Sequence, residues 1–436
     1  MTVTGAKGAE LIGEFQRRQL LAQMTSGDEL IAHLDAPRTI YCGFDPTADS
    51  LHIGSLVPLL ALRRLQRAGH KPIALVGGAT GLIGDPSHKA EERQLNTAEV
   101  VGAWVERLRT QVSQFIDFDG GGNAAVVVNN LDWMDGISAL DFLRDVGKHF
   151  SVNAMVQKES VKQRIDREGA GISFTEFSYL LLQSYDFAEL YKRHGCSVQL
   201  GGSDQWGNIT GGIDLTRRMH QAQVFGMTLP LVTKADGTKF GKTESGTIWL
   251  DPEKTSPYAF YQFWINSADA DVYKFLRYFT FMDCDEIEEV ERVDAERQGR
   301  PEAQALLAST VTELVHGAEG LRAAQRISTA MFSGEVHTLS ADDFKQLHQD
   351  GLPTSELPGA NLAEIPLTTL LVDAGVAKSG KQIKDALARE AVWINGKAVT
   401  ASQNMACAEL FAASEALSGR YFVVKLGKKS YHLLVR

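Results

Sequence analysis

The chain has 436 residues, 44% of them hydrophobic and 22% charged, with a formal net charge of −10 at pH 7. These fractions are typical of a globular protein, and the length predicts two or three domains rather than one core. No apolar stretch approaches the roughly 18 residues of a membrane-spanning helix, and residues 1–10 lack a signal-peptide pattern. The four cysteines are scattered, so neither a disulfide framework nor a zinc site is predicted, and a cytoplasmic location is expected.

Charge is unevenly distributed along the chain. Residues 365–436 contain ten Lys and Arg against five Asp and Glu, so this tail carries about +5 and the rest of the chain about −15. A basic module attached to an acidic body indicates that the tail binds a nucleic acid.

The first motif follows one or two amphipathic helices, which the pattern predicts within residues 1–38. An apolar run at 39–44 and a later leucine pattern at helical spacing predict a strand, a polar loop and a helix. His52 and Gly54 lie at the predicted helix start, where unpaired N–H groups can receive a phosphate. Gly54 lets a base or ribose approach the backbone closely. An ordinary helix start is the alternative.

Further apolar runs predict the other strands of an α/β domain. They cover residues 72–77, 124–128 and 197–200 and alternate with helical segments, which predicts a Rossmann-like parallel sheet. Gly- and Asp-bearing loops follow these runs, at the strand ends where a parallel sheet binds ligands. A long, mostly helical insert occupies about residues 131–195.

One helix of the insert carries three polar residues on one face. Tyr179, Gln183 and Asp186 have the spacing i, i+4 and i+7. Such a face is usually solvated, but the flanking residues here are apolar, which favours a polar cavity.

A Gly-rich loop with two lysines, Lys239 and Lys242, follows a strand-like segment at 229–232. The loop is either a solvated hairpin tip or a clamp whose ammonium groups neutralise phosphates.

The chain is predicted to divide into modules. The α/β domain covers residues 1–235, and residues 236–340 carry the lysine loop and an acid-rich α-helical domain. Pro and Gly mark 341–364 as a linker. Residues 365–436 form a small α+β domain, with two helices followed by strands and an Asn-Gly turn in the first hairpin.

Two of these segments resemble signatures of class I aminoacyl-tRNA synthetases. His52-Ile-Gly-Ser55 resembles the HIGH motif and Lys239-Phe-Gly-Lys-Thr243 the KMSKS motif, in the same order and at a similar separation. The whole chain resembles the bacterial tyrosyl-tRNA synthetases, most specifically from Tyr41 to Thr243, and its tail resembles the RNA-binding fold of ribosomal protein S-four. Ser55 replaces the second His of the first signature, and Phe-Gly replaces Met-Ser in the second. A weaker contact from Ser55 and a changed loop mobility are therefore expected.

The resemblance implies a tyrosine–tRNA ligase, which activates L-tyrosine with ATP to tyrosyl-adenylate and pyrophosphate. The enzyme then transfers tyrosine to the terminal adenosine of tRNA(Tyr). The implied tyrosine site consists of Tyr41, Asp85, Tyr179, Gln183, Asp186, Gln199 and Gln205. Within it, Asp186 and Tyr41 face the phenol, and Asp85, Tyr179 and Gln183 face the ammonium group.

The resemblance also implies sites for the phosphates and the nucleotide. The implied catalytic residues are Thr47, His52, Lys239, Lys242 and Thr243. The implied ATP contacts are Cys42, Gly43, Asp45, His52, Gly54, Ser55, Lys89, Arg93, Gly202, Asp204 and Lys242. Lys89 and Arg93 are alternatively two surface charges. No permanently bound cofactor or dedicated metal site is expected, and Mg²⁺ is expected to accompany ATP, held by its phosphates.

The implied partners are a second copy of the chain, bound through the insert, and tRNA(Tyr), bound by the basic tail and the helical domain. The alternative is that the insert lies on the surface of a monomer. No membrane is expected among the partners. Three rival functions are a tryptophanyl-tRNA synthetase, a non-catalytic RNA-binding protein and a nucleotidyltransferase without tRNA. A hydroxyl–carboxylate pair, Tyr41 with Asp186, favours a phenol over an indole. The two signatures and the basic tail disfavour the other two rivals.

Overall fold

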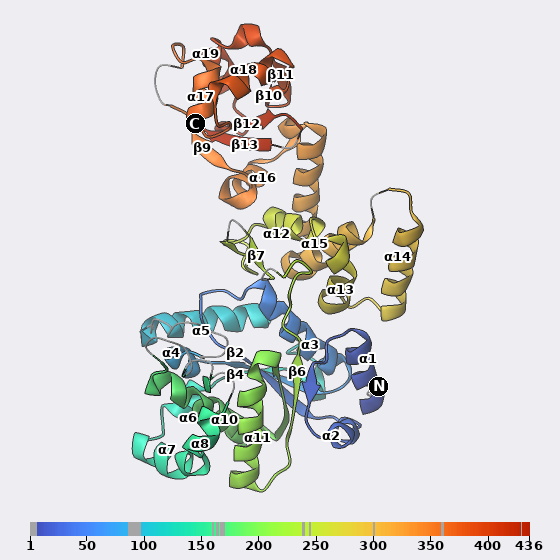
Figure 1. The fold of residues 1–436 in the computed structure, drawn as a ribbon, viewed down its shortest axis with the longest axis vertical. Coiled ribbons are helices and arrows are strands. Elements are labelled where there is room, and N and C mark those ends of the chain that lie inside the picture. The colour runs from blue at the N-terminus through green and yellow to red at the C-terminus, as the bar shows by residue number, and fades with distance from the viewer. Residues whose placement is uncertain are drawn as a thin grey trace. The chain divides into compact units, whose positions relative to one another are not determined.

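The computed structural model describes residues 7–85, 97–158, 161–162, 165, 171–237, 240–243, 246–299, 301–358, 362–428 and 430–436 (Figure 1). The chain divides into two compact units. Unit 1 comprises Met1–Asp251 and Ala268–Ala303, and unit 2 comprises Pro252–Ser267 and Gln304–Arg436. Within the described residues, no helix is long and apolar enough to cross a membrane.

A six-stranded sheet in the order β1-β6-β5-β2-β3-β4 forms the centre of unit 1. Its strands are β1 Gln23–Met24, β2 Thr39–Phe44, β3 Lys71–Val76, β4 Val126–Asn129, β5 Cys196–Gly202 and β6 Phe225–Leu229. Strands β2 to β6 are parallel and only the short β1 is antiparallel, so the predicted parallel sheet is confirmed. The chain adds β3 and β4 on one side of β2 but β5 and β6 on the other, and ligands bind at such a change of direction.

One strand prediction was wrong. The strand-like segment at 229–232 is not a strand, because β6 covers Phe225–Leu229 and ends before Pro230. Proline has no N–H to donate to a neighbouring strand, so the ladder stops there. The four residues instead run along the edge of a cavity.

Helices connect the strands and cover the sheet. They are α1 Gly8–Arg17, α2 Gly27–His33, α3 Leu56–Arg67, α4 Thr80–Ile83, α5 Ala98–Val112, α6 Leu131–Met134, α7 Ala139–Asp145, α8 Val152–Val156, α10 Phe174–His194 and α11 Trp206–His220. Helices α10 and α11 lie side by side (Figure 1). Ser173 caps the N-terminus of α10, and Gly195 ends it with a positive φ of 61°. The buried face of α10 contributes Phe187 and Leu190 to a core shared with Tyr41 of β2.

The rest of unit 1 follows the lysine loop. Strands β7 Lys242–Thr243 and β8 Gly246–Thr247 form a small hairpin, and α13 Asp269–Phe279 and α14 Cys284–Glu296 come later in the chain. The buried Arg64 of α3 donates a hydrogen bond to the carbonyl of Thr280. This contact fixes the end of α13 against α3 beside the sheet.

Unit 2 contains a helical part and a second sheet. The helices are α12 Pro257–Ile265, α15 Ala303–Ser333, α16 Ala341–Gln346, α17 Leu367–Asp373, α18 Gly380–Ala388 and α19 Cys407–Leu410. The sheet has the order β11-β10-β12-β13-β9, with β9 Thr354–Glu356, β10 Val392–Ile394, β11 Lys397–Val399, β12 Tyr421–Leu426 and β13 Ser430–Val435. The predicted Asn-Gly turn joins β10 to β11, with positive φ at Asn395 and Gly396.

The second sheet is covered on both faces. One face packs on α17 and α18, and Tyr421 and Val423 on the other face pack on residues of α15 and α16. Strand β9 lies within the segment predicted as a linker and pairs in parallel with β13.

Candidate active site

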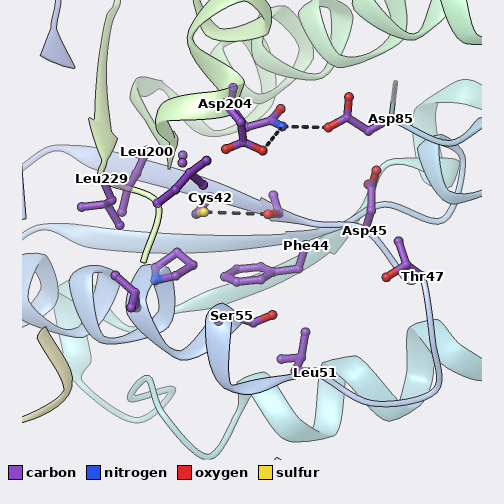
Figure 2. A pocket seen from close by; sticks show the side chains of 18 of the residues that line it. Cys42, Phe44, Asp45, Thr47, Leu51, Ser55, Asp85, Leu200, Asp204 and Leu229 are labelled. Carbon is purple, nitrogen blue, oxygen red and sulfur yellow. Dashed lines mark hydrogen bonds between the residues drawn. The ribbon is translucent and has the colours of Figure 1, made fainter. Parts of the chain in front are cut away.

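A cavity of about 690 Å³ opens at the carboxyl ends of β2 and β5 (Figure 2). It lies where the strand order changes direction, because β2 and β5 are neighbours in the sheet. The predicted site residues that line it are Tyr41, Cys42, Gly43, Asp45, Thr47, His52, Gly54, Ser55, Asp85, Tyr179, Gln183, Asp186, Gln199, Gly202, Asp204 and Gln205. The structure therefore brings together residues from five separate segments of the chain.

For the other five predicted site residues, the structure does not describe the side chain. Lys89, Arg93 and Lys239 lie outside the described residues. The backbone of Lys242 and Thr243 forms β7, but their side chains are not described.

Asp186 is a buried carboxylate, only 2% exposed. It accepts hydrogen bonds from Asn130 Nδ2 at 3.0 Å and from Trp133 Nε1 at 2.8 Å. Burial raises the pKa of Asp186 to about 8, against the opposing effect of the two N–H donors. The carboxyl group is thus fixed in orientation, and its charge is costly unless a ligand compensates for it.

Sequence reasoning missed Asn130 and Trp133. Asn130 follows β4 directly, and Trp133 lies in the short helix α6 that comes next. The rule that ligand-binding loops follow parallel strands applies here as it does after β2, β3 and β5. It could have identified Asn130, but nothing in the local sequence indicates that Trp133 reaches Asp186.

Three buried polar atoms of residues that line the cavity have no hydrogen-bond partner among the described residues. They are the Tyr41 hydroxyl, Gln183 Oε1 and Gln199 Oε1. Tyr41 and Gln199 are direct neighbours in the β2–β5 register, and the Tyr41 ring packs edge-on against Phe187 with centroids 5.2 Å apart. Burial also raises the pKa of Tyr41 well above its usual value, so its hydroxyl stays protonated. Because buried polar groups are normally paired, this cluster indicates a polar ligand.

A second carboxylate, Asp45, is linked to the first by hydrogen bonds. The Tyr179 hydroxyl donates to Asp45 Oδ2 at 2.6 Å, and Thr80 Oγ1 donates to Asp45 Oδ1 at 2.7 Å. Asn130 Nδ2 lies 3.0 Å from Thr80 Oγ1 as well as from Asp186. Burial and the nearby Asp45 raise the pKa of Tyr179, so it donates rather than accepts. One asparagine therefore connects both carboxylate sites.

The opposite wall of the cavity is acidic. Gln205 Nε2 donates to Asp85 Oδ2 at 2.7 Å and to Asp204 Oδ2 at 3.1 Å, as Figure 2 shows. Asn208 Nδ2 holds the other end of the same amide, Gln205 Oε1, at 3.0 Å. An amide that bridges two carboxylates fixes both of them facing the cavity, where they can accept hydrogen bonds from an ammonium group or from ribose hydroxyls.

His52 lies at the start of a short 3₁₀ turn, Ile53–Ser55, that leads into α3. Its Nδ1 accepts a hydrogen bond from the backbone N–H of Gly54 at 2.9 Å, so the proton of the neutral ring is on Nε2. A Cβ atom at Gly54 would lie 2.8 Å from the His52 ring. Glycine is therefore required here to let the imidazole fold back onto the turn.

The lysine loop is anchored close to His52. The ring of Phe240 stacks on Phe279 with centroids 5.2 Å apart and packs on Phe275 at 5.1 Å. Gly241 has φ of 75°, and a Cβ there would lie 2.5 Å from the side chain of Ile53. The Phe-Gly pair thus has a structural reason: the aromatic ring binds α13, and glycine lets the loop pass against the residue after His52.

Comparison with known proteins agrees with this geometry. Residues 34–333 match the family described as class I tRNA synthetases (W and Y), and residues 343–434 match the C-terminal domain of the tyrosine–tRNA ligases. The tyrosine–tRNA ligase of Aliivibrio salmonicida is 61% identical over 427 residues, which cover 98% of both chains. The chain belongs to the tyrosine–tRNA ligase family.

Other members are similar over comparable lengths. The tyrosine–tRNA ligase of Serratia proteamaculans is 58% identical over 428 residues, 98% of this chain and 99% of that one. A C-terminally truncated mitochondrial tyrosyl-tRNA synthetase of Aspergillus nidulans superposes with a TM-score of 0.66 at 29% identity. That structure covers 74% of this chain, so the similarity in fold extends over most of this chain.

Proposed function

We propose that the chain activates L-tyrosine with ATP to give tyrosyl-adenylate and pyrophosphate, and then transfers tyrosine to tRNA(Tyr). The observation that carries this proposal is the buried pair formed by Asp186 and the unpartnered Tyr41 hydroxyl. A phenol placed between them donates its proton to the carboxylate and accepts one from Tyr41. An indole can only donate, and phenylalanine offers neither a donor to Asp186 nor an acceptor to the Tyr41 hydroxyl, so the pair favours tyrosine over either.

The amino end of the substrate belongs on the other side of the cavity. Tyr179, Gln183 and Asp85 surround that side, and Gln205 orients Asp85. We assign these three residues to the ammonium group, with Gln199 and Gln205 as the neighbouring polar shell. The substrate carboxylate then points toward the loop after β2, where Thr47 and His52 lie.

Activation proceeds at that loop. A carboxylate oxygen of tyrosine bonds to the α-phosphorus of ATP, the bond from this phosphorus to the bridging oxygen breaks, and pyrophosphate leaves with that electron pair. Thr47 and the Nε2–H of His52 stabilise the developing negative charge. Lys239, Lys242 and Thr243 close over the pyrophosphate, and the two lysines neutralise its charge. No protein nucleophile takes part, so positioning and charge supply the catalysis.

The nucleotide occupies the remaining cavity wall. We assign to it Cys42, Gly43, Asp45, Gly54, Ser55, Gly202 and Asp204, with Lys89 and Arg93 as further phosphate contacts. The described residues contain no group of three or more His, Cys, Asp or Glu side chains that could hold a metal. Mg²⁺ is therefore proposed to arrive with ATP, coordinated mainly by phosphate oxygens.

We further propose that the sheet of unit 1 is a Rossmann-like domain and that residues 365–436 adopt the RNA-binding fold of ribosomal protein S-four. In this second domain, Lys378, Lys381, Lys384, Arg389, Arg420 and Lys428 are exposed and have no ion pair among the described residues. Unneutralised cations of this number suit the phosphates of tRNA(Tyr). A hydroxyl of the terminal adenosine then attacks the tyrosyl carbonyl carbon, and AMP leaves.

A homodimer through the insert is supported by its surface. Large apolar side chains are exposed at Leu131, Leu140, Leu143, Val152, Ile165 and Phe174, with Leu140 at 79%. Isolated apolar side chains are common on surfaces, but several on adjacent elements mark an interface. A second copy of the chain is the proposed partner.

The test is exchange of labelled pyrophosphate into ATP, with each of the twenty amino acids supplied singly and without tRNA. Exchange with tyrosine alone supports the proposal, and exchange with tryptophan would overturn the roles of Tyr41 and Asp186. Absence of exchange with every amino acid would refute catalysis. Asp186→Asn should abolish tyrosine-dependent exchange, whereas Asp132→Asn, an exposed acid on the helix of Trp133, should leave it unchanged.

A further inference from the structure

Two aromatic side chains of unit 2 are exposed, one at the end of a helix and one in the sheet. Phe332, at the end of α15, is 91% exposed, and Trp393, in β10, is 39% exposed. Among the described residues, neither ring packs against another aromatic ring or a cation. Single exposed apolar side chains are common on protein surfaces, so the surroundings of these two rings decide whether they have a role.

The segments that carry the two rings meet at one junction between α15 and the sheet. Tyr431 of β13 donates its hydroxyl to the carbonyl of Met331, the residue before Phe332. On the other side, a Cβ at Gly396 would collide with the carbonyl oxygen of Gly334, so the β10–β11 turn lies directly against the end of α15.

Trp393 faces the same side of the sheet as this junction. Its neighbours Val392 and Ile394 point into the core under α17 and α18, so Trp393 points to the opposite face. Its cross-strand partner on β12 is Lys425, whose Nζ lies 5.0 Å from the Tyr431 ring centroid. Lys425 is thus the cross-strand neighbour of Trp393, and its ammonium group lies over the ring of Tyr431.

The charge of this surface is positive. Lys425 and the exposed Lys428 form no ion pair among the described residues. The nearby acid Glu415 is paired with Lys397 at 3.0 Å, and Glu335 lies 3.4 Å from the Ser333 hydroxyl. An exposed ring whose cross-strand neighbour is a lysine without an ion pair among the described residues matches one nucleotide of a single strand, whose base stacks on the ring while its phosphate meets the cation.

We propose that Trp393, with Lys425 beside it, stacks an unpaired base of the bound tRNA and contacts its phosphate, and that Phe332 extends this surface. The proposal rests on the proposed function, in which this domain binds tRNA(Tyr), and adds that it binds an unstacked nucleotide on the face opposite α17 and α18. Duplex RNA offers no free base face, so the contact selects a loop, bulge or splayed end.

The test is the Kd for a tRNA(Tyr) transcript, measured as a function of salt for Trp393→Ala, Trp393→Phe and Lys425→Gln. Trp393→Ala should weaken binding about fivefold or more without changing the salt slope, because stacking involves no phosphate. Trp393→Phe should restore most of the affinity. Lys425→Gln should reduce the salt slope by about one. Met405→Ala, which removes an exposed apolar side chain elsewhere in the domain, should change neither quantity.

Tyrosine-dependent pyrophosphate exchange, measured on the same proteins, separates the two proposals. Normal exchange together with normal tRNA binding in Trp393→Ala would overturn the stacking proposal but not the proposed function. Trp393 would then be assigned to contact with a protein partner. Equal weakening by Trp393→Ala and Met405→Ala would also overturn it, since the effect would then be structural. Loss of exchange and of tRNA binding in the unchanged protein would refute the proposed function itself.

Discussion

Replacing Tyr41 with phenylalanine should change stability and specificity in opposite directions. The Tyr41 hydroxyl is buried and has no hydrogen-bond partner among the described residues. An unsatisfied buried polar group costs about 1–3 kcal/mol, so its removal should raise the free energy of unfolding by about this amount. The melting temperature of the empty enzyme should then rise by a few degrees.

The same change should weaken recognition of tyrosine. One neutral hydrogen bond to the phenol contributes about 0.5–1.5 kcal/mol, which corresponds to a loss of about two- to tenfold in kcat/KM for tyrosine. Phenylalanine should lose nothing, so the preference for tyrosine over phenylalanine should fall by the same factor. Calorimetry of the empty protein and pyrophosphate exchange with both amino acids measure the two effects.

Tyr185→Phe is the matched control. Its hydroxyl is also on the inner side of α10 but is hydrogen-bonded to Glu189, so the substitution should lower stability and leave specificity unchanged. A fall in the melting temperature of Tyr41→Phe would refute the reasoning, because it would mean that the hydroxyl is satisfied in the empty protein.

Three further predictions follow from the site. Trp133→Phe removes one hydrogen-bond donor to Asp186, and such a bond to a charged acceptor contributes about 1.5–3 kcal/mol. The KM for tyrosine in pyrophosphate exchange should therefore rise tenfold or more, while the KM for ATP stays constant. Because the folded pKa of Asp186 is raised to about 8, the ligand-free protein keeps a proton that the unfolded chain loses, so its stability should fall as pH rises from about 4 to 8. The melting temperature of Asp186→Asn minus that of the unchanged protein should therefore increase over this interval. A constant difference would contradict the prediction. Gly241→Ala should lower the kcat of exchange far more than Gly237→Ala. Both glycines have positive φ, but only a Cβ at Gly241 contacts Ile53. Equal effects would show that backbone strain alone lowers the rate.

Much of the site was predictable because its residues obey local rules. The spacing of Tyr179, Gln183 and Asp186 fixes one helix face whatever that helix packs against. Apolar runs that end in Gly or Asp likewise predict strand ends, and the carboxyl ends of parallel strands meet at one edge of a sheet. The resemblance to the tyrosyl-tRNA synthetases, and not these rules, assigned Tyr41 and Gln199 to one site, and the register now makes them neighbours in the sheet.

The rest depends on contacts between distant segments, which no local pattern encodes. Trp133 looks like a core residue of a short helix, and only the fold brings its N–H to Asp186. The replacement of Met-Ser by Phe-Gly in the lysine loop predicted altered mobility without a cause. What the local sequence could not show is that Phe240 packs on Phe275 and Phe279, more than thirty residues later in the chain. The two-residue strand β1 is too short to give any periodic signal.

Several polar groups that line the cavity lower the stability of the ligand-free protein. Asp186 has a raised pKa because it is buried, and the Tyr41 hydroxyl, Gln183 Oε1 and Gln199 Oε1 of the same cavity have no partner among the described residues. A pocket optimised for stability would contain apolar side chains here. Each unpaired group lowers the stability of the ligand-free protein, and a ligand with matching donors and acceptors removes this cost. Tyrosine binding should accordingly stabilise unit 1 more than its contact area predicts, and an amino acid without a hydroxyl should not.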